Sequence, residues 1–416
     1  MLIRKIEFSN FRGYSQGSLA FQEGFNLIVG VNGVGKSTVL EAIRVSLSHV
    51  LPLVSDYEKR WTYGFRQSDI KMGAKEGMEI RADFTTNSAA FGLRIQRDKE
   101  DQADDVEDKP SAQTEFVPPL SSLERLLTSE DVGKHQPIGL YFSTHRSKVS
   151  NRKSDNAITG QGGAHYESLI HNRDFNLREI AEWFSVQMML GEESDELKNH
   201  IIDIVDAVSS LMPGFTNFGI TKLGPNYNGP LTLSLSKDGN ILPANWLSDG
   251  ERSMLSLGFD LARRLIIANP GLPHPIRDGR AIVLIDELDL HLHPRWQRLV
   301  VKQLTSTFPN CQFICTTHSP QLIGEVPAER VTVIGAGTVY HPRQTFGVDS
   351  SRVLEEVMGA APRNAEVQKV MNTLFGLIDD ENLDEAREVL QRLIEMVGES
   401  DTEVLRAETM IMFLED

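Results

Sequence analysis

The fold of this chain is decided by Gly30-Val31-Asn32-Gly33-Val34-Gly35-Lys36-Ser37-Thr38, a glycine-rich loop that ends in Lys-Ser-Thr. The apolar run 25–29 before the loop is typical of a buried strand, and residues 39–43 after it open a predicted helix. The spacing of Gly, four residues and Gly-Lys-Ser is that of a phosphate-binding loop, whose backbone N–H groups and helix N-terminus face phosphate oxygens. The flanking strand and helix disfavour a chance match. The sequence therefore predicts a nucleotide site with these binding residues: Asn32, Gly33, Gly35, Lys36, Ser37 and Thr38.

A second strand predicts the chemistry of this site. Residues 281–285 are a continuous apolar run that ends in Asp286 and Glu287. Carboxylates at the C-terminal end of a buried parallel strand face the ligand in α/β sheets. Asp286 is expected to hold Mg²⁺, directly or through water, together with the hydroxyl of Ser37. Glu287 is expected to orient or deprotonate the attacking water, while Lys36 reaches the β- and γ-phosphates. ATP and Mg²⁺ are therefore the expected cofactors.

The composition is that of an ordinary globular protein. The 416 residues are 40% hydrophobic and 24% charged, which is enough to bury one large core or two to three smaller ones. No apolar run approaches the ~18 residues of a membrane span, and the first residues lack the apolar core of a signal peptide. Cys311 and Cys315 lie in one predicted strand segment and are expected to pack as small hydrophobic side chains. A cytoplasmic location and no membrane partner are expected.

The net charge of −16 is unevenly distributed. Residues 351–416 hold 16 acidic and 6 basic side chains, so the first 350 residues carry little net charge. A possible nucleic-acid surface must therefore be a local patch. Its best candidate is the basic cluster of Arg146, Lys148, Arg152 and Lys153, which a solvated loop explains equally well. The acidic end of the chain is expected to face solvent or a protein partner.

Several separated motifs together resemble the SMC/RecF-type ABC ATPases. The segment Ile6-Glu7-Phe8-Ser9-Asn10-Phe11-Arg12 precedes the phosphate loop. Far along the chain, Leu247-Ser248-Asp249-Gly250-Glu251 resembles the ABC signature, and the run 281–287 resembles the Walker B strand. Leu288-Asp289-Leu290-His291-Leu292-His293-Pro294 then resembles the next family motif, with Asp289 in place of glutamate. The strand 312–317 ends at His318, in the place of the switch histidine.

The resemblance implies roles for further residues. Arg12 would approach the nucleotide, with an ordinary surface arginine as the alternative. His318 would read the γ-phosphate beside the catalytic Glu287. A second protomer would present its signature in trans to that phosphate, through the residues Ser248, Asp249, Gly250 and Glu251. The pair His291 and His293 could indicate a metal site, but the family has this spacing without a metal.

The chain departs from the family pattern in its middle part. The strand 138–143 is not followed by the glutamine that touches Mg²⁺ in ABC ATPases, and Ser143, His145 and Arg146 are the alternatives for its place. Residues 166–212 have helical spacing without sustained heptads, so the coiled-coil arms of long family members are absent. The acidic, proline-containing stretch 98–119 predicts a mobile surface loop.

The expected fold class is α/β, an ABC-type P-loop ATPase head with a mixed-sheet lobe, a helical lobe and a C-terminal helical extension. Helices are expected at about 364–379, 383–397 and 401–414, and their apolar faces either pack on one another or dock a partner protein. The expected domains are an N-terminal lobe 1–150 with Walker A, a short helical insertion 151–245, a C-terminal lobe 246–345 with signature, Walker B and switch histidine, and an acidic helical tail 346–416.

The tail from Phe346 to Gly359 resembles a compact bacterial group of anti-phage ATPases of the Septu and retron type. This implies an ATPase that forms a head-to-tail homodimer or higher homo-oligomer on ATP. It also implies an effector nuclease partner of HNH type, docked on the C-terminal helices. No glutamate-rich Toprim motif follows His318, so no nuclease domain of its own is expected. A RecF-like DNA repair ATPase that binds DNA is the alternative. The ATPase subunit of a membrane importer fits poorly, because the N-terminal Phe-Arg segment and the Leu-His-Leu-His-Pro motif are not transporter features.

Overall fold

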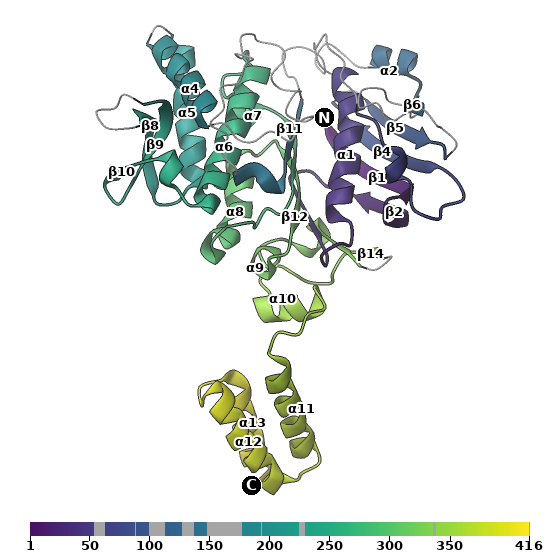
Figure 1. Ribbon diagram of the computed structural model, residues 1–416, viewed down its shortest axis with the longest axis vertical. Helices are drawn as coiled ribbons and strands as arrows, with labels where there is room; N and C mark the ends of the chain where they lie inside the picture. Colours follow the sequence, from purple (N-terminus) through teal and green to yellow (C-terminus); the bar gives the residue numbers. More distant parts are fainter. Residues whose placement is uncertain are drawn as a thin grey trace. The chain divides into compact units, whose positions relative to one another are not determined.

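The computed structural model describes residues 1–53, 63–87, 89–99, 113–126, 137–147, 177–192, 194–223, 229–335 and 338–415. The basic residues Lys148, Arg152 and Lys153 and the predicted loop 151–165 lie outside these residues. The chain forms two compact units, Met1–Val348 and Asp349–Asp416 (Figure 1).

The first unit is built on a six-stranded sheet with the order β14-β13-β3-β12-β11-β7. The first five strands in chain order run parallel, and β14 pairs antiparallel with β13. The strands are β3 (Phe25–Val29), β7 (Ile138–Phe142), β11 (Ala281–Ile285), β12 (Gln312–Thr317), β13 (Val331–Ile334) and β14 (Val339–Tyr340). Every residue of β3, β11 and β12 is buried, which confirms these predicted strands. Because they are parallel neighbours, their carboxyl ends meet at one edge of the sheet.

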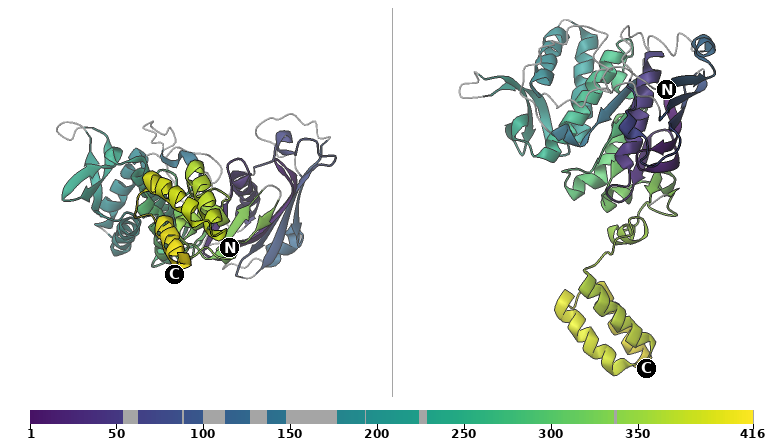
Figure 2. Two further views of the ribbon diagram at one scale, coloured as in Figure 1. Left: turned by 90° about the horizontal axis from the view of Figure 1, so that it is seen from below. Right: turned by 45° about the vertical axis from the view of Figure 1, so that its right-hand side comes forward.

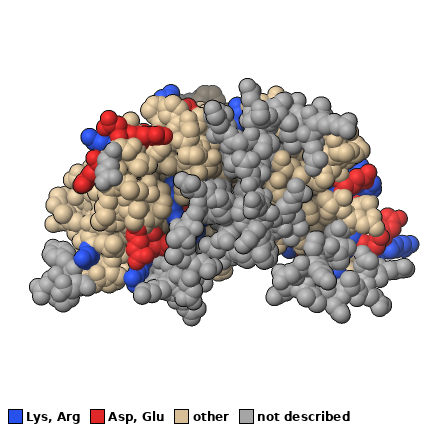
Figure 3. Space-filling view, turned by 90° about the horizontal axis from the view of Figure 1, so that it is seen from above, with Lys and Arg blue, Asp and Glu red and all other residues tan. Residues whose placement is uncertain are grey.

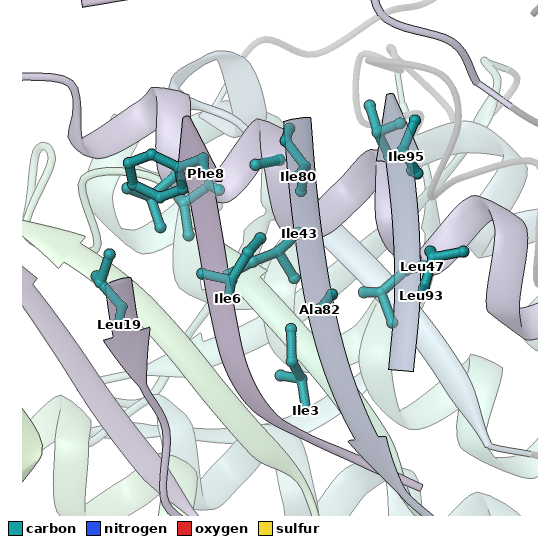
Figure 4. Close-up of a cluster of buried hydrophobic side chains, with 14 of the residues drawn as sticks. Ile3, Ile6, Phe8, Leu19, Ile43, Leu47, Ile80, Ala82, Leu93 and Ile95 are labelled. Carbon is teal, nitrogen blue, oxygen red and sulfur yellow. The ribbon is translucent and has the colours of Figure 1, made fainter. Parts of the chain in front are cut away.

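A second, antiparallel sheet has the order β2-β1-β4-β5-β6. Its strands are β1 (Leu2–Phe11), β2 (Tyr14–Ala20), β4 (Met78–Thr85), β5 (Ala90–Arg97) and β6 (Gln113–Val117). Buried and less buried residues alternate along β4 and β5, so one face of this sheet is apolar. That face packs on α1 (Lys36–Val50), as the side chains in Figure 4 show. The same core includes Ile28, Ile282 and Ile314 of the six-stranded sheet, so α1 is enclosed between the two sheets.

Strand β6 corrects part of the predicted mobile loop over 98–119. Residues 113–117 pair antiparallel with residues 92–96 of β5. Their side chains are mostly exposed, so the sequence carries no alternating apolar signal there. The strand is held at the edge of the sheet by backbone hydrogen bonds instead of burial. Residues 100–112 of the predicted loop lie outside the described part of the chain.

A helical lobe lies on the other side of β11 and β12 from α1 (Figure 1 and Figure 2). Its main helices are α4 (Leu177–Gly191), α5 (Asp195–Leu211) and α6 (Asp249–Ala268). A small antiparallel sheet completes it, with the strands β8 (Phe215–Lys222), β9 (Leu231–Lys237) and β10 (Asn240–Pro243). The sequence predicts β9 but not β8 or β10, so the segment 151–245 is not purely helical. The polar run of β8, interrupted by an irregular register between Thr216 and Gly219, hides its strand character.

Shorter elements connect these parts. The α-helices are α2 (Leu120–Leu126), α7 (Pro275–Asp278), α8 (Pro294–Thr307) and α9 (Pro320–Ile323). The 3₁₀ turns are η1 (Leu51–Leu53), η2 (Gln67–Asp69), η3 (Thr144–Ser147), η5 (Ala244–Trp246) and η6 (Ala328–Arg330). In the part of the chain that the structure describes, no helix is both long and apolar enough to cross a membrane.

The second unit is helical throughout its described elements: α10 (Ser350–Glu356), α11 (Ala365–Asp379), α12 (Leu383–Val397) and α13 (Thr402–Glu415). The last three confirm the predicted helices to within a residue. Leu374, Leu393 and Val404 are fully buried where these helices pack on one another. The predicted apolar faces therefore pack together. Met412 and Phe413 are left 69% and 81% exposed.

Candidate nucleotide site

The phosphate loop connects the end of β3 to the start of α1. Gly33 and Gly35 have φ of +77° and +105°, a conformation that glycine adopts without strain. The Lys36 ammonium donates to the carbonyl oxygens of Gly30 at 3.0 Å and Val31 at 3.2 Å, so its side chain lies back across the loop. No side chain caps α1, and its first turn holds no acidic residue. The first-turn N–H groups and Lys36 thus form a positive end suited to a phosphate.

The other predicted loop residues lie on the same turn. Asn32 is exposed at the tip of the loop, and Thr38 is half-buried in the first turn of α1. The Ser37 hydroxyl donates to Asp286 Oδ1 at 3.1 Å, and the Thr316 hydroxyl donates to the same oxygen at 2.6 Å. Hydroxyl and carboxylate oxygens are ligands that Mg²⁺ prefers, so this donor set fits Mg²⁺ held by Ser37 and Asp286.

Glu287 begins a sharp turn directly after β11, and residues 286–288 are called the Walker B turn below. Glu287 has a φ of +49°, which is uncommon for a residue other than glycine. Its backbone N–H donates to the Thr316 hydroxyl at 2.7 Å, and the N–H of Leu288 donates to the Thr316 carbonyl at 2.9 Å. Strand β12 therefore holds the turn on which the candidate catalytic carboxylate is placed.

His318 reaches the phosphate loop from the end of β12. Its Nε2 lies 2.7 Å from the Lys36 ammonium. Burial lowers the pKa of His318, and the positive charge of Lys36 lowers it further. Burial also lowers the pKa of Lys36, while Asp286 and Glu287 oppose that shift. The short distance is best satisfied by a neutral imidazole that accepts a hydrogen bond from the ammonium.

Asp289 has a role that the sequence reasoning missed. Its Oδ1 accepts hydrogen bonds from the Thr317 hydroxyl at 2.5 Å and the His318 backbone N–H at 3.3 Å. The shorter side chain that replaces the family glutamate thus holds the backbone at the end of β12, including that of His318. In the sequence, the aspartate at a position where the family has glutamate marks residue 289 as unusual. Only the structure shows that its carboxylate contacts Thr317 and His318.

The signature residues lie at the start of α6, apart from the phosphate loop, since α6 and α1 lie on opposite sides of β11 and β12 (Figure 1). The Ser248 hydroxyl accepts from the Glu251 backbone N–H, and the Glu251 carboxylate accepts from the Ser248 backbone N–H at 2.9 Å. Asp249 pairs with Arg252, and its side chain is 52% exposed. A methyl group at Gly250 would overlap the backbone carbonyl of His291, so only glycine fits where α6 meets this loop.

Arg12 lies in the turn between β1 and β2 and has a φ of +48°. Its Nε donates to Asp69 Oδ1 at 2.8 Å, and its side chain is 38% exposed. Tyr14 from the same turn contacts the loop, because a methyl group at Gly35 would lie 2.6 Å from its ring. The structure therefore places Tyr14, two residues after Arg12, against the loop, and it pairs the Arg12 guanidinium with Asp69.

The prediction that Arg146 contacts nucleic acid is wrong, because its side chain is buried. The residue is only 5% exposed, and its guanidinium donates to the backbone carbonyls of Asp286 and Glu287, both at 2.5 Å. A buried side chain that is engaged in this way cannot reach a nucleic-acid backbone. On the face shown in Figure 3, the described Lys and Arg side chains lie scattered among Asp and Glu. His145, another alternative for the missing glutamine, is exposed.

The remaining metal-binding candidates have other surroundings. His293 caps α8, accepting from the Arg295 backbone N–H at 3.2 Å, and His291 is exposed with a φ of +62°. Burial raises the pKa of the Cys311 thiol to about 12 and also raises that of Cys315. Within the described ranges, no group of three or more His, Cys, Asp or Glu side chains is arranged to hold a metal ion.

Three functional groups thus meet at the carboxyl ends of three parallel strands: the phosphate loop after β3, the carboxylates after β11 and the histidine after β12. With α1 between a mixed sheet and an antiparallel sheet, and with a helical lobe that carries the signature, this arrangement defines an ABC-type P-loop ATPase head. The chain belongs to the family described as "AAA domain, putative AbiEii toxin, Type IV TA system", whose model matches residues 25–324. The chain is an ATPase of this family.

Several relatives align with most of this chain. The retron Ec83 probable ATPase of Escherichia coli is 26% identical, with 90% of this chain and 80% of that protein covered. The retron Vc95 probable ATPase of Vibrio cholerae serotype O1 biovar El Tor is 27% identical, with 80% and 73% covered. The Septu protein PtuA of Bacillus thuringiensis is 22% identical, with 96% and 95% covered.

Two solved structures of ATPase heads each align over 82% of this chain. An Smc head bound to the C-winged helix domain of ScpA aligns over 82% of this chain and 97% of that chain, with a TM-score of 0.49 and 16% identity. The recombination mediator protein RecF aligns over 82% of this chain and 98% of that chain, with a TM-score of 0.41 and 17% identity.

Proposed function

We propose that this chain binds ATP with Mg²⁺, closes into a head-to-tail dimer, and through that dimer regulates an effector nuclease in anti-phage defence. The observation that carries the ATP part is the convergence of Lys36, Ser37, Asp286 and His318, each within 3.1 Å of another member of the set. The four side chains follow the carboxyl ends of three neighbouring parallel strands, β3, β11 and β12, which meet at one edge of the sheet.

The residues of the phosphate loop bind and orient the substrate. Lys36 exchanges its two carbonyl partners for phosphate oxygens, which are better partners because they are charged. Ser37 and Asp286 would hold Mg²⁺, which when bound would neutralise charge on the β- and γ-phosphates. Arg12 would approach the nucleotide if its bond to Asp69 opened.

Glu287 and His318 serve hydrolysis. Glu287 directly follows Asp286 in the turn after β11, and from there its carboxylate would orient or deprotonate a water molecule. The His318 ring, neutral beside Lys36, can donate or accept at the γ-phosphate once Lys36 has turned to the nucleotide.

A second protomer would complete the site with its signature residues. Ser248 and Asp249 lie exposed at the start of α6, on the opposite side of β11 and β12 from the phosphate loop of the same chain. Trp246, two residues before Ser248, is 73% exposed. A head-to-tail arrangement would cover this surface and bring Ser248 of one protomer to Lys36 of the other.

The proposal of an effector nuclease rests on the relatives and on the second unit. Relatives covering most of the chain carry the names retron ATPase and Septu protein. In α13, Met412 and Phe413 expose apolar surface that the packing of α11, α12 and α13 does not use. Such a surface on an acidic unit suits a partner protein.

The ATPase proposal is tested with Glu287→Gln. Phosphate release at saturating ATP and Mg²⁺ is expected to fall about 100- to 10,000-fold, while ATP binding is retained and light scattering shows a long-lived dimer. Glu329→Gln, at an exposed carboxylate of the same unit, serves as the control. Unchanged turnover in Glu287→Gln would remove Glu287 from its role.

The partner proposal is tested with Phe413→Asp. A nuclease of HNH type encoded beside this gene is expected to copurify with the wild-type chain and to be lost from the variant. Phe346→Asp, which changes a 63% exposed apolar residue of the first unit, is the matched control. Equal recovery with both variants would contradict docking on α13.

A further inference from the structure

Arg146 joins three segments that are far apart in the sequence. It lies in η3, directly after β7, and is 5% exposed. Its guanidinium donates to all three carbonyl oxygens of the Walker B turn, to Asp286 and Glu287 at 2.5 Å and to Leu288 at 3.3 Å. On its other edge, Nε donates to the Ser253 hydroxyl of α6 at 2.8 Å.

The Walker B turn depends on these bonds. Its backbone N–H groups are bound by the neighbouring strands, since Asp286 donates to the Phe142 carbonyl at 2.9 Å and the next two residues donate to Thr316. Its carbonyl oxygens accept from Arg146, and the Glu287 carbonyl also accepts from the Leu290 backbone N–H at 2.9 Å. The positive φ of Glu287 is a strained conformation that persists only when its surroundings hold it from both sides. A planar guanidinium with five donors can bridge successive carbonyls, which a lysine ammonium cannot do in the same geometry.

Ser253 extends the network to the start of α6. The helix is continuous from Asp249 to Ala268, so Ser248 at its cap and Ser253 in its second turn move as one body. In the proposed dimer, Ser248 faces the nucleotide of the other protomer. A displacement of α6 by that nucleotide would therefore act through Ser253 and Arg146 on Glu287 of the same chain.

We infer that Arg146 is a positioning residue that holds Glu287 in the Walker B turn. The bond from Arg146 to Ser253 then couples this turn to α6, which carries the signature residues at its start. The coupling half rests on the proposed head-to-tail dimer. Each protomer then hydrolyses its own ATP efficiently only when the signature helix has engaged the ATP of the other protomer.

The test uses Ser253→Ala in the full chain. This variant removes one hydroxyl but leaves Arg146 and its carbonyl bonds in place, so the protein is expected to fold. The kcat for ATP hydrolysis is expected to fall about tenfold, the ratio that one charge-assisted hydrogen bond corresponds to, with KM unchanged. The melting temperature is expected to fall slightly, because the buried Nε of Arg146 loses its acceptor. The Hill coefficient for ATP is expected to fall from near its limit of about 2 for two sites toward 1.

Ser256→Ala is the matched control. Ser256 is equally buried on the same helix, but its hydroxyl donates only within α6, to the Arg252 carbonyl at 2.6 Å. Equal kcat and Hill coefficient in the two variants would overturn the inference. A kcat loss in Ser253→Ala that comes with a raised KM and an unchanged Hill coefficient would also overturn it, because it indicates a merely structural role. If Glu287→Gln also left turnover intact, the proposed function itself would fail, whereas a slowed Glu287→Gln beside a normal Ser253→Ala rejects the inference alone.

Discussion

Helices α1 and α6 both begin at predicted nucleotide motifs, but their N-termini differ in capping and in charge. Helix α1 starts at Gly35 with no side-chain cap and no acidic residue in its first turn. Helix α6 starts at Ser248 with a reciprocal capping box, in which the Glu251 carboxylate accepts from the Ser248 backbone N–H and hydroxyl, both at 2.9 Å. An anion can approach α1 directly, whereas at α6 it meets a carboxylate of the chain itself.

The charge state of Glu251 sharpens this difference. Burial alone would raise the pKa of its carboxyl, but hydrogen bonds from Lys237 and Ser248 outweigh burial and lower it. The carboxylate is therefore ionised at neutral pH and competes with phosphate for the helix end. In the proposed dimer, one protomer would bind ATP at α1 by itself, and α6 would engage only a phosphate already held by the second protomer.

The largest expected effect separates the two helix ends. Lys36→Met should weaken ATP binding by a single protomer about 100-fold or more, because charge-assisted bonds to phosphate are worth about 1.5–3 kcal/mol each. Ser248→Ala should change it by no more than about twofold, since distant sites act independently. Titration with a fluorescent ATP analogue measures the ATP affinity of both variants, at a protein concentration too low for dimers to form. A large loss in Ser248→Ala would mean that α6 serves the site of its own chain.

An intermediate effect is expected at Glu251. In a Glu287→Gln background, which prevents turnover, Glu251→Gln should strengthen ATP-dependent dimerisation about fivefold, the ratio for about 1 kcal/mol at a helix end. It should also lower the unfolding free energy by about 1 kcal/mol, because the capping box is weakened. Sedimentation equilibrium and urea unfolding give the two values. Weaker dimerisation would show that the carboxylate helps the contact.

The smallest expected effect is a pH dependence at the α1 end. The lowered pKa of His318 means that the native state takes up this proton less readily than the unfolded chain, where histidine titrates near about 6.5. Stability should therefore be level above that pH and fall as the pH drops below it toward the native pKa. His318→Gln should lose less stability than the wild type between pH 7.5 and 5.5, as read from urea midpoints. His49, whose pKa burial also lowers, is present in both proteins and cancels. Equal losses would place the His318 ring away from Lys36.

The main groups of the nucleotide site could be predicted from the sequence. The phosphate loop, the Asp286-Glu287 pair and His318 are each a short motif at the end of an apolar run, so strand type and motif can be read together. Their convergence follows from one rule, that the carboxyl ends of neighbouring parallel strands meet. The three C-terminal helices could also be predicted from the sequence, because their apolar residues recur with helical spacing.

Arg146 shows where this reasoning fails. In the sequence it is a basic residue among other basic residues, and it suggests a surface contact. In the structure its partners Ser253, Asp286 and Glu287 lie more than a hundred residues away. Edge strand β6 was missed for a related reason, because backbone pairing leaves no pattern in the side chains.

The sequence by itself determined that this chain carries an ATP site, which strands carry the reacting groups, and that a helical segment follows, because motifs and periodicity are local properties. Only the tertiary structure decided that Asp289 holds the backbone at His318, that Arg12 pairs with Asp69, and that the buried Arg146 bridges the Walker B turn and α6. Each of these depends on the distance between side chains far apart in the chain, and that distance is set by how the sheets and helices pack.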